Sequence, residues 1–79
     1  MFYVYILTAK DNQTFIGCTD DLRYTIKKHF LGFVRETKNQ MPLKLLAYFA
    51  FLNEQTAYNF EKYLKSSSGR IFMKKNAFI

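Results

Sequence analysis

Apolar runs separated by polar turns predict three strands. Phe2–Leu7 (FYVYIL) is rich in aromatic and β-branched residues, and Thr14–Gly17 (TFIG) has the same character. The turn-forming stretch Lys10–Gln13 lies between them, so we expect an antiparallel hairpin. A third run, Leu43–Leu52 (LKLLAYFAFL), has a length and an aromatic content that favour a buried strand over a helix.

A first helix is predicted directly after the hairpin. Asp20 and Asp21 stand in its first turn, where acids interact favourably with the helix dipole. Lys27, Lys28 and His29 stand in its last turn, where cations do the same. The polar, basic stretch that follows has no clear period, and we expect a loop as far as the proline.

Two more helices complete the predicted order. Glu54–Lys65 has apolar residues at helical spacing, with Asn53 as its N-cap. We expect this helix to stop in Ser66–Gly69 and a short last helix to span Arg70–Lys75. The fold class is therefore α+β, a small three-stranded antiparallel sheet flanked by helices in the order β-β-α-β-α-α.

The composition sets limits on the class of protein. A chain of 79 residues forms one domain, here residues 1–79, and 9 Phe with 6 Tyr supply a dense core. The single cysteine, Cys18, has no disulfide partner, and no Cys/His group has zinc spacing. No apolar run approaches the roughly 20 residues of a membrane helix, and the N-terminus lacks the features of a secretory signal. We expect a cytoplasmic protein without a membrane span.

The charge predicts a polyanionic partner. Twelve Lys and Arg against six Asp and Glu give a net charge of +6, and acidic membranes or acidic proteins are the alternatives to nucleic acid. Binding to nucleic acid would depend on salt and only weakly on sequence. Each lysine could instead merely keep a Phe-rich domain soluble. The residues that we expect to contact nucleic acid are Lys27, Lys28, Lys38, Lys65 and Arg70.

Glu61 is a residue that local rules do not explain. At 100° per residue it shares one helical stripe with Ala57, Phe60 and Leu64, so its carboxylate points toward the apolar side. One explanation is a boundary position, with the carboxylate in solvent or paired with Lys65 at i+4. The other is a metal ligand, because a single carboxylate with waters and phosphate oxygens is a normal way to hold Mg²⁺.

His29 and Tyr5 raise the same question. His29 lies on the inward stripe of the first helix with Leu22 and Ile26, where it is either a hydrogen-bonded core residue or part of a site. Tyr5 lies in the middle of a strand, and its phenol needs a partner if it is buried. Gly17 on the adjoining strand would leave room for another group to approach the ring.

These residues fall in the order of the GIY-YIG nuclease family, which the chain resembles over nearly its whole length, in particular its small single-domain bacterial members. Tyr3-Val4-Tyr5 looks like the first half of the motif and Phe15-Ile16-Gly17 like the second. Each half alone is a weak signal, and the full series is specific. The other matching segments are Asp21-Leu22 with His29, Thr37-Lys38, Pro42 with Lys44-Leu45, Glu61-Lys62-Tyr63-Leu64-Lys65-Ser66, and Ser68-Gly69-Arg70.

The resemblance implies hydrolysis of DNA phosphodiesters with one divalent metal, Mg²⁺ or Mn²⁺. The family's first tyrosine falls on Tyr5, its helix histidine on His29 and its metal-binding glutamate on Glu61. Two family positions are changed, because the second tyrosine is Phe15 and the catalytic arginine is Thr25. Threonine has no charge to stabilise a transferring phosphoryl group.

Arg23 cannot easily replace that arginine, since it lies about 200° from Thr25 around the helix axis. The sequence therefore supports two functions. The first is a GIY-YIG-type DNA endonuclease weakened by Phe15 and Thr25, and the second is a catalytically inactive DNA-binding or protein-interaction domain on the same fold. In both cases we expect five positions to converge on one concave side of the sheet: Tyr5, Gly17, Thr25, His29 and Glu61.

Overall fold

Three antiparallel strands form the centre of the computed structural model, which describes all 79 residues. The strands are β1 (Phe2–Thr8), β2 (Thr14–Thr19) and β3 (Lys44–Phe51), in the sheet order β2-β1-β3. The helices are α1 (Leu22–Phe30), α2 (Glu54–Leu64) and α3 (Ser67–Lys75). The predicted order and fold class are confirmed, and no helix has the length and apolar character needed to cross a bilayer.

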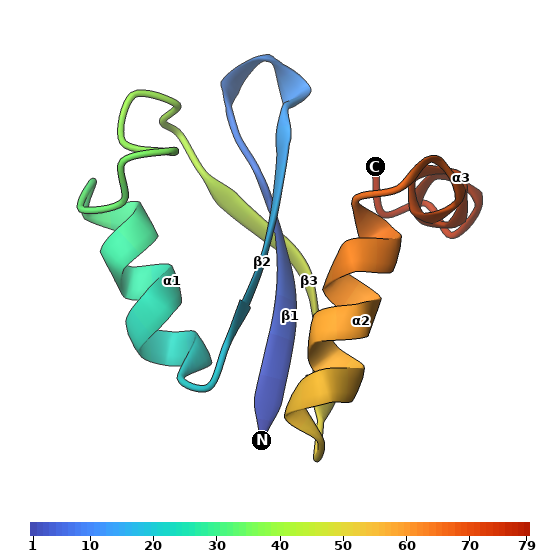
Figure 1. Cartoon of the computed structure of the whole chain (residues 1–79). Coiled ribbons are helices and arrows are strands. Elements are labelled where there is room, and N and C mark those ends of the chain that lie inside the picture. Colours follow the sequence, from blue (N-terminus) through green and yellow to red (C-terminus); the bar gives the residue numbers. More distant parts are fainter.

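Alternation along β1 gives the sheet two different faces. Val4 and Ile6 are fully buried and pack in one cluster with residues of α2 and α3. The residue between them, Tyr5, points the other way and contacts α1. Because successive side chains of a strand point to opposite faces, α1 covers one face of the sheet while α2 and α3 cover the other, as Figure 1 shows.

The main core lies on the face covered by α2 and α3. Ala57 and Leu64 of α2 and Met73 of α3 are buried there against β1. Aromatic rings extend this core, and Phe60 contacts Phe49 edge to face with ring centroids 4.8 Å apart. On the opposite face, His29 is the only buried residue of α1. The face covered by α1 is therefore less completely packed than the face covered by α2 and α3.

The start of α3 differs from the prediction. This helix begins at Ser67 and not at Arg70, because Ser66 caps it and its hydroxyl accepts the Gly69 N–H at 3.2 Å. Gly69 is buried against the backbone of Tyr63 and Leu64, where a Cβ atom would clash. The serine run is thus the first turn of a helix and not a loop.

Candidate active site

A chain of three hydrogen-bonded side chains lies between the sheet and α1. The Tyr5 hydroxyl is 3.1 Å from Nε2 of His29, and Nδ1 of His29 is 2.8 Å from Oγ1 of Thr37. All three residues are buried. Burial lowers the pKa of His29, so the imidazole is neutral at pH 7. A neutral imidazole has one donor and one acceptor nitrogen, which lets Tyr5 donate to Nε2 while Nδ1–H donates to Thr37.

Gly17 lets Tyr5 reach the edge of the sheet. Tyr5 pairs with Gly17 across β1 and β2, and the Tyr5 ring fills the space that a side chain at position 17 would occupy. The room beside Gly17 is therefore taken by Tyr5 itself and not by another approaching group. Since β2 is an edge strand, the phenol comes to lie over the rim of the sheet.

The charge of Glu61, which belongs to α2 on the opposite face of the sheet, affects the pKa values of residues near the β2 edge. Burial raises the pKa of Tyr5, and the negative charge of Glu61 raises it further. The same two causes, in the same order, raise the pKa of Cys18 in β2. The phenol therefore keeps its proton at pH 7, and the Glu61 carboxylate lies within electrostatic reach of the edge strand.

The expectation of one shared concave side is wrong. His29 belongs to α1 and Glu61 to α2, and these helices cover opposite faces of the sheet (Figure 1). The reason is topological, because α2 packs its apolar stripe on the face that carries Val4 and Ile6. Any site that uses both residues has to extend around the β2 edge.

A groove of about 510 Å³ runs along this edge. Phe15 of β2 lines it together with Lys65, which follows α2, and Arg70 of α3. The hydroxyl-bearing residues Ser66 and Ser67 lie in the same groove. Two of the five predicted DNA contacts therefore share a hollow with one of the substituted family positions.

Thr25 places no positive charge in the site. Its hydroxyl is 2.7 Å from the Thr19 hydroxyl at the end of β2, so this side chain joins α1 to the edge strand. Arg23 lines a different hollow on the far side of α1, as its angular position predicts. Neither residue supplies a cation beside Tyr5.

The other predicted DNA contacts lie away from the groove. Lys27 lines the hollow that contains Arg23, and Lys28 lies over the Tyr24 ring with Nζ 5.5 Å from its centroid. Lys38 is exposed in the loop after α1. The basic residues are thus divided among several surfaces.

Sequence reasoning gave no role to two threonines that hold the site together. Thr37 was noted only for its place in the family order, yet it is fully buried and anchors the His29 ring. Thr19 bonds to Thr25 and also accepts the N–H of Asp21, the N-cap of α1. Each contact joins two segments of different structure, so no periodic pattern in the sequence predicts it.

The residues present suit only a sparse metal site. No three His, Cys, Asp or Glu residues cluster to hold an ion. The Glu61 side chain is 14% exposed, and one of its oxygens accepts from Lys65 Nζ at 2.9 Å. This leaves one carboxylate oxygen for a cation, a donor set that fits Mg²⁺ when water and substrate phosphate complete the shell.

Two relatives have similar sequences. The UPF0213 protein BH0048 of Halalkalibacterium halodurans is 38% identical over 69 residues, which are 86% of this chain and 73% of that protein. The UPF0213 protein CPE1444 of Clostridium perfringens is 38% identical over 66 residues, which are 82% of this chain and 71% of that protein.

A solved structure is also similar to this chain. The solution NMR structure of the UPF0213 protein BH0048 from Bacillus halodurans matches with a TM-score of 0.60 and 33% identity, over 95% of this chain and 84% of that one. The model of the GIY-YIG catalytic domain matches residues 1–76. Because that match covers nearly the whole chain, the protein belongs to the GIY-YIG family and contains its nuclease-type module.

Proposed function

We propose that this domain is a DNA endonuclease of reduced activity, which hydrolyses phosphodiester bonds beside Tyr5 at the β2 edge of the sheet. The observation that carries the proposal is the hydrogen-bonded chain Tyr5–His29–Thr37. Its imidazole is neutral and its phenol is protonated at pH 7, as the directions of their pKa shifts require. Such a pair can accept a proton from a water molecule at one end and hold it at the other.

The proposed proton path runs from water to His29. A water molecule beside the Tyr5 hydroxyl attacks the phosphorus and gives its proton to the phenol oxygen, while the phenol proton moves to Nε2 of His29. Thr37 keeps the imidazole in the required orientation through Nδ1. The new P–O bond forms as the bond to the leaving oxygen breaks.

Glu61 is the residue that would hold Mg²⁺ or Mn²⁺. A divalent ion there would stabilise the negative charge that develops on the phosphoryl oxygens. Lys65 and Arg70 line the groove and would neutralise neighbouring phosphates of the bound DNA. In this assignment Lys65 moves from the carboxylate to a phosphate when substrate binds.

The activity is low because the phosphate clamp is incomplete. Thr25 offers a hydroxyl that is already bonded to Thr19, where the family has arginine. Removing one well-placed donor from a developing oxyanion costs about 10²- to 10³-fold in rate. Phe15 keeps a ring in the groove and lacks the second hydroxyl.

A catalytically inactive DNA-binding or protein-interaction domain is the second candidate. Two contacts favour it, namely the Thr25–Thr19 bond and the Glu61–Lys65 pair. Each contact gives the side chain at a family site position, Thr25 or Glu61, a partner within the protein, so that this side chain is not free to bind substrate or metal. In this alternative, the basic groove binds the phosphate backbone without cutting it.

A nicking assay separates the two candidates. Supercoiled, branched and single-stranded DNA are incubated with the protein and Mg²⁺ or Mn²⁺, beside the Glu61→Ala variant. Glu54→Ala is the matched control, because it removes an exposed carboxylate from the first turn of the same helix. We expect slow cleavage that Glu61→Ala abolishes and Glu54→Ala preserves. DNA that stays intact with every protein, while still being bound, would favour the inactive domain.

A further inference from the structure

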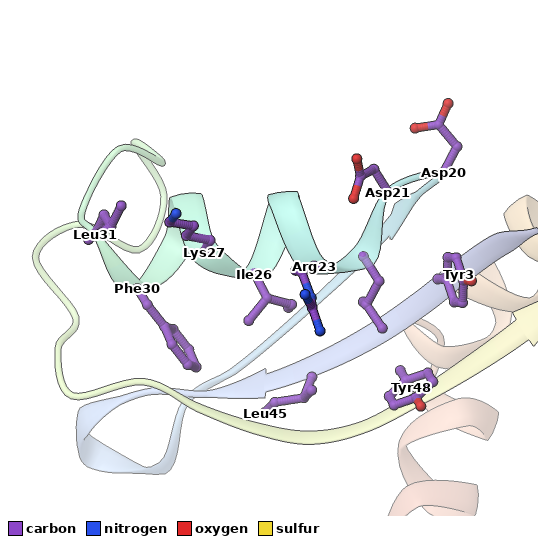
Figure 2. A pocket seen from close by; sticks show the side chains of 11 residues that line it. Tyr3, Asp20, Asp21, Arg23, Ile26, Lys27, Phe30, Leu31, Leu45 and Tyr48 are labelled. Carbon is purple, nitrogen blue, oxygen red and sulfur yellow. The ribbon is translucent and has the colours of Figure 1, made fainter.

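A second hollow lies on the far side of α1, between α1 and β3 (Figure 2). Its volume is about 800 Å³, and it shares no lining residue with the groove along β2. Ile26, Phe30 and Leu45 point into it, while Tyr3 and Tyr48 close one end. This volume is in the range of pockets that hold ligands, roughly 300 to 1,000 Å³.

Four charged residues line this hollow, namely Asp20, Asp21, Arg23 and Lys27. In Figure 2 the Arg23 side chain extends from α1 toward the strands, whereas the carboxylates of Asp20 and Asp21 point away from them. Asp21 is also occupied as the N-cap of α1, where it accepts the Tyr24 N–H at 3.1 Å. Within the hollow, the guanidinium is therefore directed toward the strands and the two carboxylates are directed outward.

A smaller hollow of about 450 Å³ continues the surface around α1. It shares Lys27 and Leu31 with the first one and adds Phe33, Tyr24 and Lys28. We call the combined surface the α1 strip. Its aromatic residues are Tyr3, Tyr24, Phe30, Phe33 and Tyr48, its cations are Arg23, Lys27 and Lys28, and its acids are Asp20 and Asp21.

Four of the five aromatic side chains of the α1 strip are open to solvent. Phe33 is 71% exposed, Tyr24 60%, Tyr48 54% and Phe30 46%. Exposed aromatic residues that gather on one surface mark a binding site more often than single scattered ones do. The fold itself does not use this exposed area, because the core lies on the other face of the sheet.

We propose that the α1 strip binds single-stranded DNA. Nucleobases stack on aromatic rings, and cations between those rings neutralise the phosphates, which is the usual composition of a single-strand binding surface. Base faces are accessible only in an unpaired strand, so a duplex would leave the four rings unused. The choice of DNA over another polyanion rests on the proposed function, and the net charge of +6 agrees with it.

The α1 strip lies across α1 from the hydrogen bonds that His29 and Thr25 make with the sheet. Thr25 and His29 of α1 face β2 and β1, whereas Arg23 and Lys27 face the strip. A strand held on the strip would therefore be tethered across α1 from Tyr5 and His29 without contacting them. The protein would thus favour DNA that has an unpaired segment next to its cleavage site.

The test measures fluorescence anisotropy of a labelled oligo-deoxythymidine of about 12 nucleotides at low salt, with EDTA present. The Tyr48→Ala/Phe33→Ala double variant should bind about tenfold more weakly than the parent protein. Arg23→Gln should reduce the slope of log affinity against log salt by about 0.7. Circular dichroism checks the fold, and substitutions of exposed side chains should preserve it.

Matched controls lie on α2. Tyr58 is 50% exposed, and Lys62 Nζ lies 5.5 Å from the centroid of its ring, so the pair repeats the chemistry of the strip elsewhere. Tyr58→Ala and Lys62→Gln should leave oligo-deoxythymidine binding unchanged within about twofold. The binding assay contains EDTA, so it tests the α1 strip without any metal and without cleavage. A protein that binds the oligonucleotide in this assay and never cleaves DNA in the nicking assay would refute the proposed function alone.

Several results would overturn the proposal. An equal loss of affinity in the α2 controls would assign binding to diffuse charge. A duplex that binds as tightly as the single strand, with the same sensitivity to Tyr48→Ala/Phe33→Ala, would contradict stacking. Tighter binding of oligo-uridine would make RNA the ligand. No oligonucleotide binding, together with a dimer that Phe33→Ala dissociates, would make a second copy of the chain the occupant.

Discussion

At the scale of single residues, the proposed proton path depends on an uncharged His29. Its two nitrogens are bonded to Tyr5 and Thr37, and burial makes a positive charge costly there. The sequence singled out Tyr5, His29 and Glu61, because each is a polar group among apolar neighbours. It could not show that Thr37 holds the ring, since that contact joins a helix to an irregular loop.

His29 gives the stability a predictable pH dependence. It is the only histidine, and its pKa is lower in the folded state than the ordinary value of about 6.5. The unfolded chain therefore binds more protons as the pH falls below about 6.5, and the free energy of unfolding decreases until the lowered pKa is passed. Above about 6.5 this contribution is fully present.

Urea unfolding between about pH 7.5 and pH 5 measures the effect. We expect the parent protein to lose stability over this range and the His29→Gln variant, which keeps one donor and one acceptor, to lose less. Carboxylates titrate mainly below this range, so they leave the comparison intact. Equal pH slopes in the two proteins would mean that His29 is not buried in its neutral form.

The Lys65 ammonium competes with a metal ion for Glu61. The pair is partly exposed, and such pairs contribute at most about 1 kcal/mol, so Lys65→Gln should tighten Mn²⁺ binding by no more than about fivefold. Electron paramagnetic resonance of free Mn²⁺ measures the affinity without any cleavage. Lys62→Gln is the control, since it removes a similar charge from a residue that is paired with Tyr58 instead. Tightening in both variants would reflect net charge alone, and Glu61 would not be the ligand.

At the scale of elements, the strands were easier to predict than the helix boundaries. Aromatic and β-branched runs specify a strand locally, and β1, β2 and β3 lie where those runs occur. The start of α3 depends on Gly69 packing against α2, a tertiary contact that the serine-rich stretch does not reveal. The sequence also did not predict which face of the sheet each helix covers. An apolar stripe shows that a helix packs against something, but it does not show against which face.

The Ser66 cap has a measurable effect on stability. Ser66→Ala removes the acceptor of the Gly69 N–H, and losing such a cap costs about 0.5 to 2 kcal/mol of unfolding free energy. Urea denaturation gives this value. Ser68→Ala is the control, because Ser68 lies exposed within the same helix and does not cap it. A similar loss in both variants would show that helix propensity and not the cap is responsible.

At the scale of the whole molecule, two surfaces of different character have no lining residue in common. The groove along β2 contains polar residues of β2, of α3 and of the connecting segments, whereas the α1 strip contains aromatic rings, cations and two carboxylates. The family resemblance predicted the fold, and of the catalytic positions that it implied, Phe15 alone lines the first surface. The second surface could not be read from the sequence, because Tyr48 reaches the helix only through the pairing of β3 with β1.

The central claim is that the scaffold still supports phosphodiester hydrolysis and lacks only part of its phosphate clamp. Thr25→Arg breaks the bond to Thr19 and returns a cation one helical turn before His29, and Phe15→Tyr returns a hydroxyl to the groove. The double variant is compared with the parent protein, with circular dichroism to confirm folding. A third protein adds Glu61→Ala to the double variant.

The initial rate of nicking of supercoiled DNA in Mg²⁺ is the decisive measurement. We predict that the double variant nicks at least about tenfold faster than the parent, which corresponds to about 1.4 kcal/mol of activation free energy. Adding Glu61→Ala should return the rate to background. A folded double variant that binds Mg²⁺ and DNA yet never cuts would contradict the nuclease assignment and leave the domain as a binding module.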